Sequence, residues 1–135
     1  MTTREIHNHL IAHGIKPFPH KVAIMQYLQT HHTHPTSDQI YNDLLPDLPT
    51  LSKTTVYNTL KLFCDKKVAI ALFIDEKNVR YDACMHTHAH FRCKHCNAIY
   101  EVPLEETDIP QCRSSEEIYP EETQIYFLGK CKECN

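Results

Sequence analysis

Four of the seven cysteines form two Cys-x2-Cys pairs, Cys93 with Cys96 and Cys131 with Cys134. Two thiols at this spacing can bind one cation through a tight turn, and two such pairs complete the tetrahedral thiolate shell of a Zn²⁺ ion. A pair of disulfides is the alternative use of these residues. We expect a cytoplasmic protein, because the chain shows neither an apolar leader segment nor an apolar run of membrane-spanning length. Paired cysteines in that compartment more often bind metal, so the pattern predicts a structural zinc site.

A second group of possible ligands lies just before the first cysteine pair, in the run His86-x-His88-x-His90. Alternate residues of an extended segment share one face, so these imidazoles would point the same way. Imidazoles bind Zn, Fe, Mn or Ni, and nearby carboxylates such as Asp82 and Glu101 suit the harder of these ions. The pattern leaves open whether this is a second metal site or a solvated polar strand.

The elements that must position these groups change in character along the chain. Apolar residues at helical spacing predict four helices over residues 3–13, 19–29, 36–45 and 52–63. Alternating residues then predict strands over 68–74 and 79–82, on either side of a turn-forming segment. This order is the outline of a winged helix-turn-helix domain.

The second half is predicted to be a small and mostly extended domain. Strands over 90–93 and 98–102 flank the first cysteine pair, a short helix could begin at 104–108 before Pro110, and a strand over 124–129 precedes the second pair. We therefore predict an α+β protein with a winged-helix DNA-binding domain over 1–82 and a small α/β metal-binding domain over 83–135. A domain of this size is marginal by itself, and bound zinc would stabilise it.

The net charge of −3 disfavours binding to a nucleic acid, but this charge is distributed unevenly between the two halves of the chain. Residues 1–81 carry 9 Lys and Arg against 7 Asp and Glu, a net charge of +2. Residues 82–135 carry 5 against 10, a net charge of −5. A mildly basic half can face phosphate while the acidic half faces away.

The helix that begins after Ser52 carries the best candidates for reading DNA. Asn58 can pair with adenine, Tyr57 can contact a thymine methyl group, and Lys61 can reach guanine or phosphate. Partial burial of Tyr57 against the preceding helix is the alternative for that ring. The remaining candidates for phosphate, base-edge or minor-groove contacts are Lys16, Lys21, Ser52, Thr54, Thr55 and Lys77.

Five short motifs together resemble the ferric uptake regulator family of metal-dependent bacterial repressors, over almost the whole chain. They are His34-Pro35-Thr36, Thr54-Thr55-Val56-Tyr57-Asn58-x-Leu60, Arg80-Tyr81-Asp82, His88-x-His90-x2-Cys93-x2-Cys96 and Gly129-x-Cys131-x2-Cys134. The resemblance implies a homodimer, assembled through the second domain, that binds double-stranded DNA at AT-rich palindromic operators. It assigns the four cysteines to structural zinc. It also implies a regulatory metal at the hinge between the domains, with the ligands His34, Asp82, His88, His90 and Glu101.

The resemblance leaves the regulatory signal open. The run from Tyr57 to Lys61 is similar to the peroxide-sensing branch, in which bound iron promotes oxidation of its own histidine ligands. That branch commonly has Asp where this chain has Glu101, which favours plain iron or manganese sensing. Cys84 points instead to the zinc-sensing branch, since a thiolate selects a softer ion. We expect regulatory Fe²⁺ or Mn²⁺, with Zn²⁺ as the alternative and with Cys84 or His86 as optional further ligands.

Three departures from the family pattern accompany the resemblance. Thr87, Ala89 and Thr123 occupy the positions of a further metal site, which we expect to be absent here. Lys21 stands where the family usually has an arginine ahead of the second helix. Pro110 limits the helix that the family uses for dimerisation.

Two other classes of protein are compatible with a histidine-rich chain. A metallohydrolase would need an open coordination position and a general base, and no His-Glu-x-x-His signature occurs. A zinc-buffering protein would not need Tyr57 and Asn58 on an exposed helix face. We therefore expect a regulator and not an enzyme.

Overall fold

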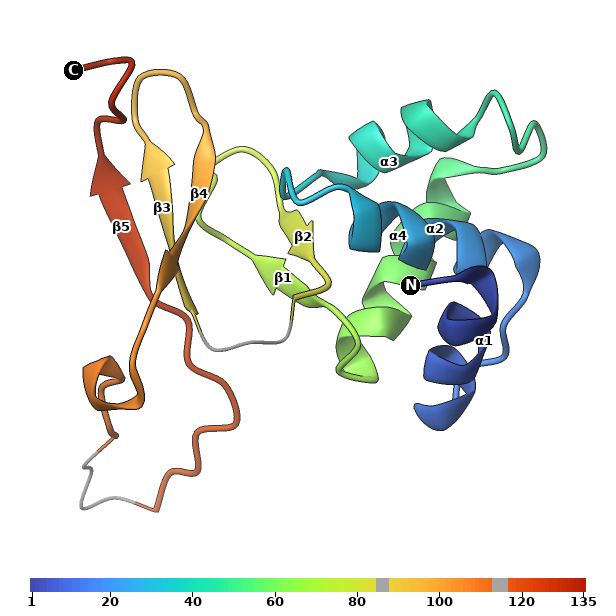
Figure 1. Cartoon of the computed structure of the whole chain (residues 1–135), viewed down its shortest axis with the longest axis horizontal. Helices are drawn as coiled ribbons and strands as arrows, with labels where there is room; N and C mark the ends of the chain where they lie inside the picture. Colours follow the sequence, from blue (N-terminus) through green and yellow to red (C-terminus); the bar gives the residue numbers. More distant parts are fainter. Residues whose placement is uncertain (85–87, 113–116) are drawn as a thin grey trace. The chain divides into compact units, whose positions relative to one another are not determined.

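The computed structural model describes residues 1–84, 88–112 and 117–135, and its internal contacts form two compact units, Met1–Met85 and His86–Asn135 (Figure 1). The division falls three residues after the predicted boundary at residue 82. His86 and Thr87, both considered above in connection with metal binding, lie outside the described residues. Among the helices of the described part, none combines the length and apolar character that crossing a bilayer requires.

The first unit consists of four helices followed by a β-hairpin (Figure 1). The helices are α1 (Thr3–Ala12), α2 (Pro19–Thr30), α3 (Ser37–Leu44) and α4 (Lys53–Asp65), and the antiparallel strands are β1 (Ile70–Leu72) and β2 (Arg80–Asp82). Each predicted element is present, although both strands are shorter than the alternating pattern suggested. The winged helix-turn-helix outline is confirmed.

Local hydrogen bonds explain where these helices begin. Thr36 precedes α3 and forms a capping box with Gln39, in which each side chain accepts a hydrogen bond from the other residue's backbone N–H, at 3.1 and 2.9 Å. Ser52 caps α4 by accepting from the Thr55 N–H at 3.0 Å. Such caps satisfy N–H groups that have no partner within the helix. The residue at which each helix begins therefore follows from the position of a capping side chain in the sequence.

The core of the first unit lies between the helices and under the hairpin. Its fully buried side chains repeat at helical spacing, as in Ile6 and Leu10 of α1 and in Val56, Leu60 and Phe63 of α4. Each helix therefore turns one apolar stripe inward and leaves the opposite face to solvent. That opposite face of α4 is the one on which the DNA-reading residues were predicted.

The second unit is a three-stranded sheet with one short helical turn in its described part. The strands β3 (His88–Cys93), β4 (Ile99–Pro103) and β5 (Tyr126–Gly129) are arranged in the order β4-β3-β5, with β4 antiparallel and β5 parallel to β3. The helix expected from 104 to 108 is only the 3₁₀ turn η1 (Glu106–Asp108). Ile109 is extended because Pro110 follows it and disfavours helical geometry in the preceding residue. The α+β class is confirmed.

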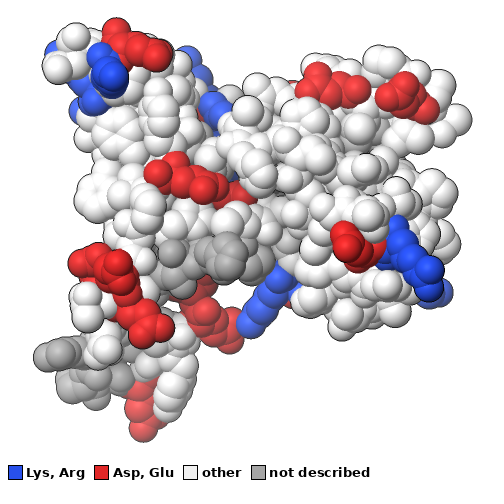
Figure 2. Space-filling view, viewed as in Figure 1, with Lys and Arg blue, Asp and Glu red and all other residues white. Residues whose placement is uncertain are grey.

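Acidic side chains gather over η1 and the coil that leads to β5, on the face of the molecule that Figure 2 shows. The exposed acidic residues of these segments are Glu105, Glu106, Asp108, Glu117, Glu121 and Glu122. A surface with this charge repels phosphate, so these segments are unsuited to bind nucleic acid.

Replacing Leu60 with alanine tests the packing of α4. Leu60 is fully buried, so Leu60→Ala is expected to lower the free energy of unfolding by about 2–5 kcal/mol. Urea unfolding followed by the helical circular dichroism signal measures this change, because the α-helices of the described part belong to the first unit. Lys61→Ala, at the adjacent exposed position, should change the value by less than about 0.5 kcal/mol. Equal losses in the two variants would contradict the assigned faces of α4.

Candidate metal centres and nucleic-acid interface

The four cysteines of the two Cys-x2-Cys pairs meet at one place in the second unit. Their sulfurs all lie within 4.8 Å of one another, and those of Cys96 and Cys131 are 3.7 Å apart. Tetrahedral coordination with Zn–S bonds of about 2.3 Å needs sulfurs about 3.8 Å apart. The donor set and its spacing therefore fit a zinc ion.

Strand pairing brings these two cysteine pairs together. Because β5 runs parallel to β3 with Gly129 opposite Cys93, the chain leaves β5 beside the first pair. A side chain at Gly129 would place its Cβ 3.3 Å from the Phe91 ring, so a larger residue there would need the ring to move by a few tenths of an ångström. Asn97 adopts φ +64° and closes the turn after the first pair, so that the Cys93 N–H donates to the Ala98 carbonyl at 2.9 Å. Asparagine tolerates this left-handed conformation better than most residues.

Hydrogen bonds shift the pKa values of the cysteine thiols in opposite directions. The Cys96 N–H donates to the Cys93 sulfur at 3.5 Å and, with further backbone donors, lowers the pKa of Cys93 to about 5. Hydrogen bonds to the other sulfurs, first that of Cys131, raise the pKa of Cys134 to about 12. Thiolates this close repel one another, so a divalent cation is the partner that allows all four to be ionised together.

A tyrosine from the neighbouring strand lies close to this cluster. The Cys131 sulfur is the first of the groups that raise the pKa of Tyr100 to about 12. Tyr100 was not predicted to lie beside the cysteines, because nothing in the local pattern of β4 indicates a neighbour beyond the end of β5.

The described histidines of β3 lie on one face, as alternation along a strand requires. The Nε2 atoms of His88 and His90 are 3.0 Å apart, and His90 is buried. In the antiparallel register His90 lies opposite Glu101 of β4, and the His88 Nε2 is 3.8 Å from a Glu101 carboxylate oxygen. Two imidazoles and a carboxylate thus converge within the second unit, which argues against a simple solvated strand.

The remaining two predicted ligands converge within the first unit. His34 and Asp82 are both buried, and the His34 Nε2 lies 3.5 Å from an Asp82 carboxylate oxygen. His34 has φ +56°, an uncommon conformation for a residue with a side chain. The backbone next to it is held by β2, since the Tyr81 N–H donates to the Pro35 carbonyl at 3.0 Å.

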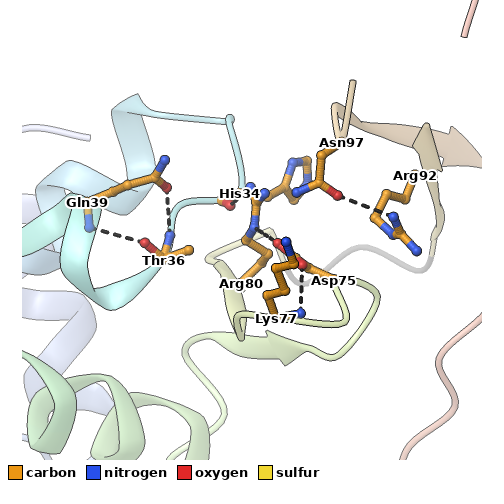
Figure 3. A network of polar contacts seen from close by, with 8 residues as sticks. All are labelled: His34, Thr36, Gln39, Asp75, Lys77, Arg80, Arg92 and Asn97. Atoms are coloured by element: carbon orange, nitrogen blue, oxygen red, sulfur yellow. Dashed lines mark hydrogen bonds and ion pairs between the residues drawn. The ribbon is translucent and has the colours of Figure 1, made fainter. Parts of the chain in front are cut away.

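Arg80 connects this histidine to the hairpin (Figure 3). One guanidinium N–H donates to the His34 carbonyl at 3.0 Å, and the Nε–H donates to the Asp75 carboxylate, also at 3.0 Å. The same Asp75 side chain accepts from the Lys77 N–H at 2.9 Å and so orders the hairpin turn. Arg80 belongs to one of the motifs named above but had no predicted role of its own, because both of its partners lie outside that motif.

The residues predicted to read DNA occupy one side of α4. Thr54, Tyr57, Asn58 and Lys61 are exposed at helical spacing, whereas Val56 and Leu60 are buried. Because the Tyr57 side chain is 54% exposed, burial against the preceding helix does not account for this ring. The exposed stripe presents hydroxyl, phenol, amide and ammonium groups, which are the donors and acceptors used at base edges and phosphates.

The other candidates for DNA contact differ in whether their polar groups already have a partner within the protein. Ser52 caps α4, and its hydroxyl donates to the half-buried Thr55 hydroxyl at 2.8 Å, so both are engaged within the helix start. Lys16 and Lys77 are exposed. The Lys21 ammonium lies 5.2 Å from the centre of the Phe18 ring, a cation–π contact at the start of α2.

Comparisons with known proteins agree with this geometry. The sequence model of the ferric uptake regulator family matches residues 12–127. The peroxide-responsive repressor PerR of Staphylococcus aureus strain Mu50 is 37% identical over 125 residues, which cover 90% of this chain and 83% of the relative.

Solved structures show the same fold. PerR from Streptococcus pyogenes is 28% identical, with a TM-score of 0.56 and coverage of 98% of this chain and 92% of that one. The Helicobacter pylori ferric uptake regulator Fur matches with a TM-score of 0.77 over 99% of this chain and 94% of its own, at 19% identity. The chain therefore belongs to the ferric uptake regulator family, a family of transcriptional regulators and not of enzymes.

Proposed function

We propose that the chain is a metal-dependent, DNA-binding transcriptional repressor that senses peroxide, ferrous iron or both through a hinge metal site. It acts as a cytoplasmic homodimer, with residues 1–82 binding DNA and residues 83–135 binding metal and forming the dimer. The observation that carries the proposal is that each unit gathers an incomplete ligand set. His34 with Asp82 offers two donors, and His88 with His90 and Glu101 offers three.

Coordination of one ion by the ligand sets of both units would couple metal binding to DNA affinity. Neither set alone fills the coordination shell of a first-row metal ion, so joint coordination would hold the two units at one angle. In a dimer that angle sets the spacing of the two α4 helices, and half-sites recur about every 34 Å along DNA. Shifting such an equilibrium from mostly open to mostly closed takes about 5.5 kcal/mol of differential binding, which several metal–ligand bonds can supply.

The nature of the donors supports Fe²⁺ or Mn²⁺ as the regulatory ion. Imidazoles together with carboxylates suit these harder ions, whereas the four thiolates of the second unit suit Zn²⁺. Bound ferrous iron would supply the electrons that reduce peroxide beside its histidine ligands. The identity to peroxide-responsive repressors favours this signal, and the Streptococcus pyogenes relative is itself described as sensing peroxide.

Zinc sensing is the second candidate, because of one residue beside the first-unit ligands. Cys84 is half-buried, and its N–H donates to an Asp82 carboxylate oxygen at 2.8 Å. A thiolate joining Asp82 would soften the ligand set towards Zn²⁺. A protein that binds metal but not DNA is less well supported, since it would not need the polar stripe on α4.

Replacing Cys96 with serine tests the structural zinc site. After a wash with a weak chelator, the unmodified protein should retain one zinc ion per chain and Cys96→Ser should retain little, because a closed thiolate shell binds zinc most tightly. Elemental analysis measures the metal. Cys112→Ser is the matched control, since Cys112 is exposed and lies outside the cluster. Equal zinc retention in Cys96→Ser and the unmodified protein would refute the site.

Alanine at one ligand from each unit tests the bridging ion. His34→Ala and His88→Ala should each weaken Fe²⁺- or Mn²⁺-dependent binding to an AT-rich operator at least tenfold, about 1.4 kcal/mol. Gel shifts with and without chelator measure this, and His32→Ala is the control because His32 is exposed. Peroxide added to the Fe²⁺ form should release DNA and add an oxygen atom to His34 or His88, detectable by peptide mass. Full metal response in either alanine variant would contradict the bridge, and a response to Zn²⁺ alone would select the zinc-sensing alternative.

Asn58→Ala tests whether α4 reads sequence. We expect this variant to weaken binding to the cognate operator by roughly 1–3 kcal/mol, the cost of one lost bidentate base contact. Binding to unrelated DNA should stay almost unchanged. Asn8→Ala, at an exposed position of α1, serves as the control in the same titrations. An equal loss on cognate and unrelated DNA would show that Asn58 contributes only to general affinity.

A further inference from the structure

Two histidines lie next to one another at the C-terminal end of α1. His9 belongs to the last turn of the helix, and His13 is the residue that follows the helix. Residues four positions apart on a helix are neighbours on its surface. The two ring centres are 4.7 Å apart, and the ring planes are inclined at 63°. His9 is half-buried and His13 is exposed, so an ion from solvent can reach both rings.

A hydrogen bond to the helix backbone fixes the orientation of the His13 ring. The His13 Nδ1 lies 2.8 Å from the His9 carbonyl oxygen. Because a carbonyl oxygen can only accept, Nδ1 carries the proton and donates, and the lone pair of the neutral ring is then on Nε2. Histidines that bind metal are commonly held in this way, with one ring nitrogen donating to a backbone carbonyl and the other bound to the ion.

The separation of the two rings matches that of two imidazoles bound to one metal ion. With metal–nitrogen bonds of about 2.0–2.1 Å and a bond angle of roughly 90–110° at the ion, the ring centres lie about 4.5–5.2 Å apart. The observed 4.7 Å falls within this range. Because both residues are held by the same helix end, little further ordering is needed when an ion binds.

We propose that His9 and His13 form a further metal site, a two-imidazole chelate on the surface of α1. The site takes a borderline first-row ion such as Ni²⁺, Cu²⁺ or Zn²⁺, since imidazole suits these ions and the affinity of divalent ions for nitrogen ligands rises from Mn²⁺ to Cu²⁺. Two protein ligands leave the other coordination positions to water, so the ion can exchange. The site shares no residue with the cysteine cluster or with the proposed hinge ligands, and the inference does not depend on the proposed function.

Calorimetric titration of the zinc-loaded full-length protein with Ni²⁺ tests the chelate, at about pH 7.5 where imidazoles are mostly neutral. His9→Ala and His13→Ala should each weaken one Ni²⁺ binding event by about 100-fold, the lower end of the gain from linking two donors. His9→Ala keeps the backbone carbonyl that accepts from His13, so it removes a ligand without removing that hydrogen bond. His7→Ala is the matched control, because residues two positions apart on a helix do not face each other.

A protection experiment locates the bound ion among the histidines of the first unit. Diethyl pyrocarbonate acylates imidazole nitrogens, and a bound metal ion blocks the reaction. Ni²⁺ at about ten times its dissociation constant should slow acylation of His9 and His13 roughly tenfold, by mass action, and leave that of His7 and His20 unchanged. Peptide mass mapping measures all four sites in the same digest, so His7 and His20 serve as internal controls.

Each outcome decides the proposal. Unchanged Ni²⁺ affinity in His9→Ala, or equal protection of His7 and His9, would overturn it. Protection of His13 by the same Ni²⁺ concentration in His9→Ala would also overturn it, because that result shows that the two rings bind independently. The decision does not require a stable His13→Ala protein, since His9→Ala and the protection data are sufficient. Ni²⁺ bound at the cysteines or at the hinge ligands contributes equally in every variant, so the differences report on α1.

Discussion

The parallel pairing of β5 with β3 is the interaction on which the second unit depends. It brings two cysteine pairs from distant parts of the sequence to one point, with sulfurs close enough to share a cation. Among the described residues of this unit, the buried apolar side chains are only those of Ala89, Cys93 and Cys131. So small a core in the single chain offsets little of the conformational entropy of folding, and bound metal and pairing with a second copy would supply further stability.

The first unit holds two proposed metal ligands, His34 and Asp82, in a fixed position beside the helices that we propose bind DNA. Its large apolar core supports the hairpin, and Arg80 and Tyr81 of β2 hold the backbone around His34. The uncommon φ of His34 is sustained by these contacts, since strained residues persist where their surroundings determine them. Thr36, two residues after His34, caps α3. A shift of His34 would therefore be transmitted directly to the start of that helix.

The second unit contains two proposed ligand sets of different chemistry. The imidazole and carboxylate groups on β3 and β4 suit a harder ion, whereas the thiols of the two cysteine pairs suit zinc. The alternation of β3 keeps them apart, since His88 and His90 share one face and Cys93 lies on the other.

The sequence by itself determined the features that depend on neighbouring residues. The helix starts at Thr36 and Ser52, the apolar stripe of α4, the turn between Cys93 and Cys96 and the common face of His88 and His90 all follow from spacing within a few positions. Only the tertiary structure decided the contacts between distant segments: Cys93 with Cys131, His90 opposite Glu101, and Arg80 with Asp75 and His34. Local periodicity states which face a side chain occupies but not which strand will lie against it, because that choice is made by the register of the whole sheet.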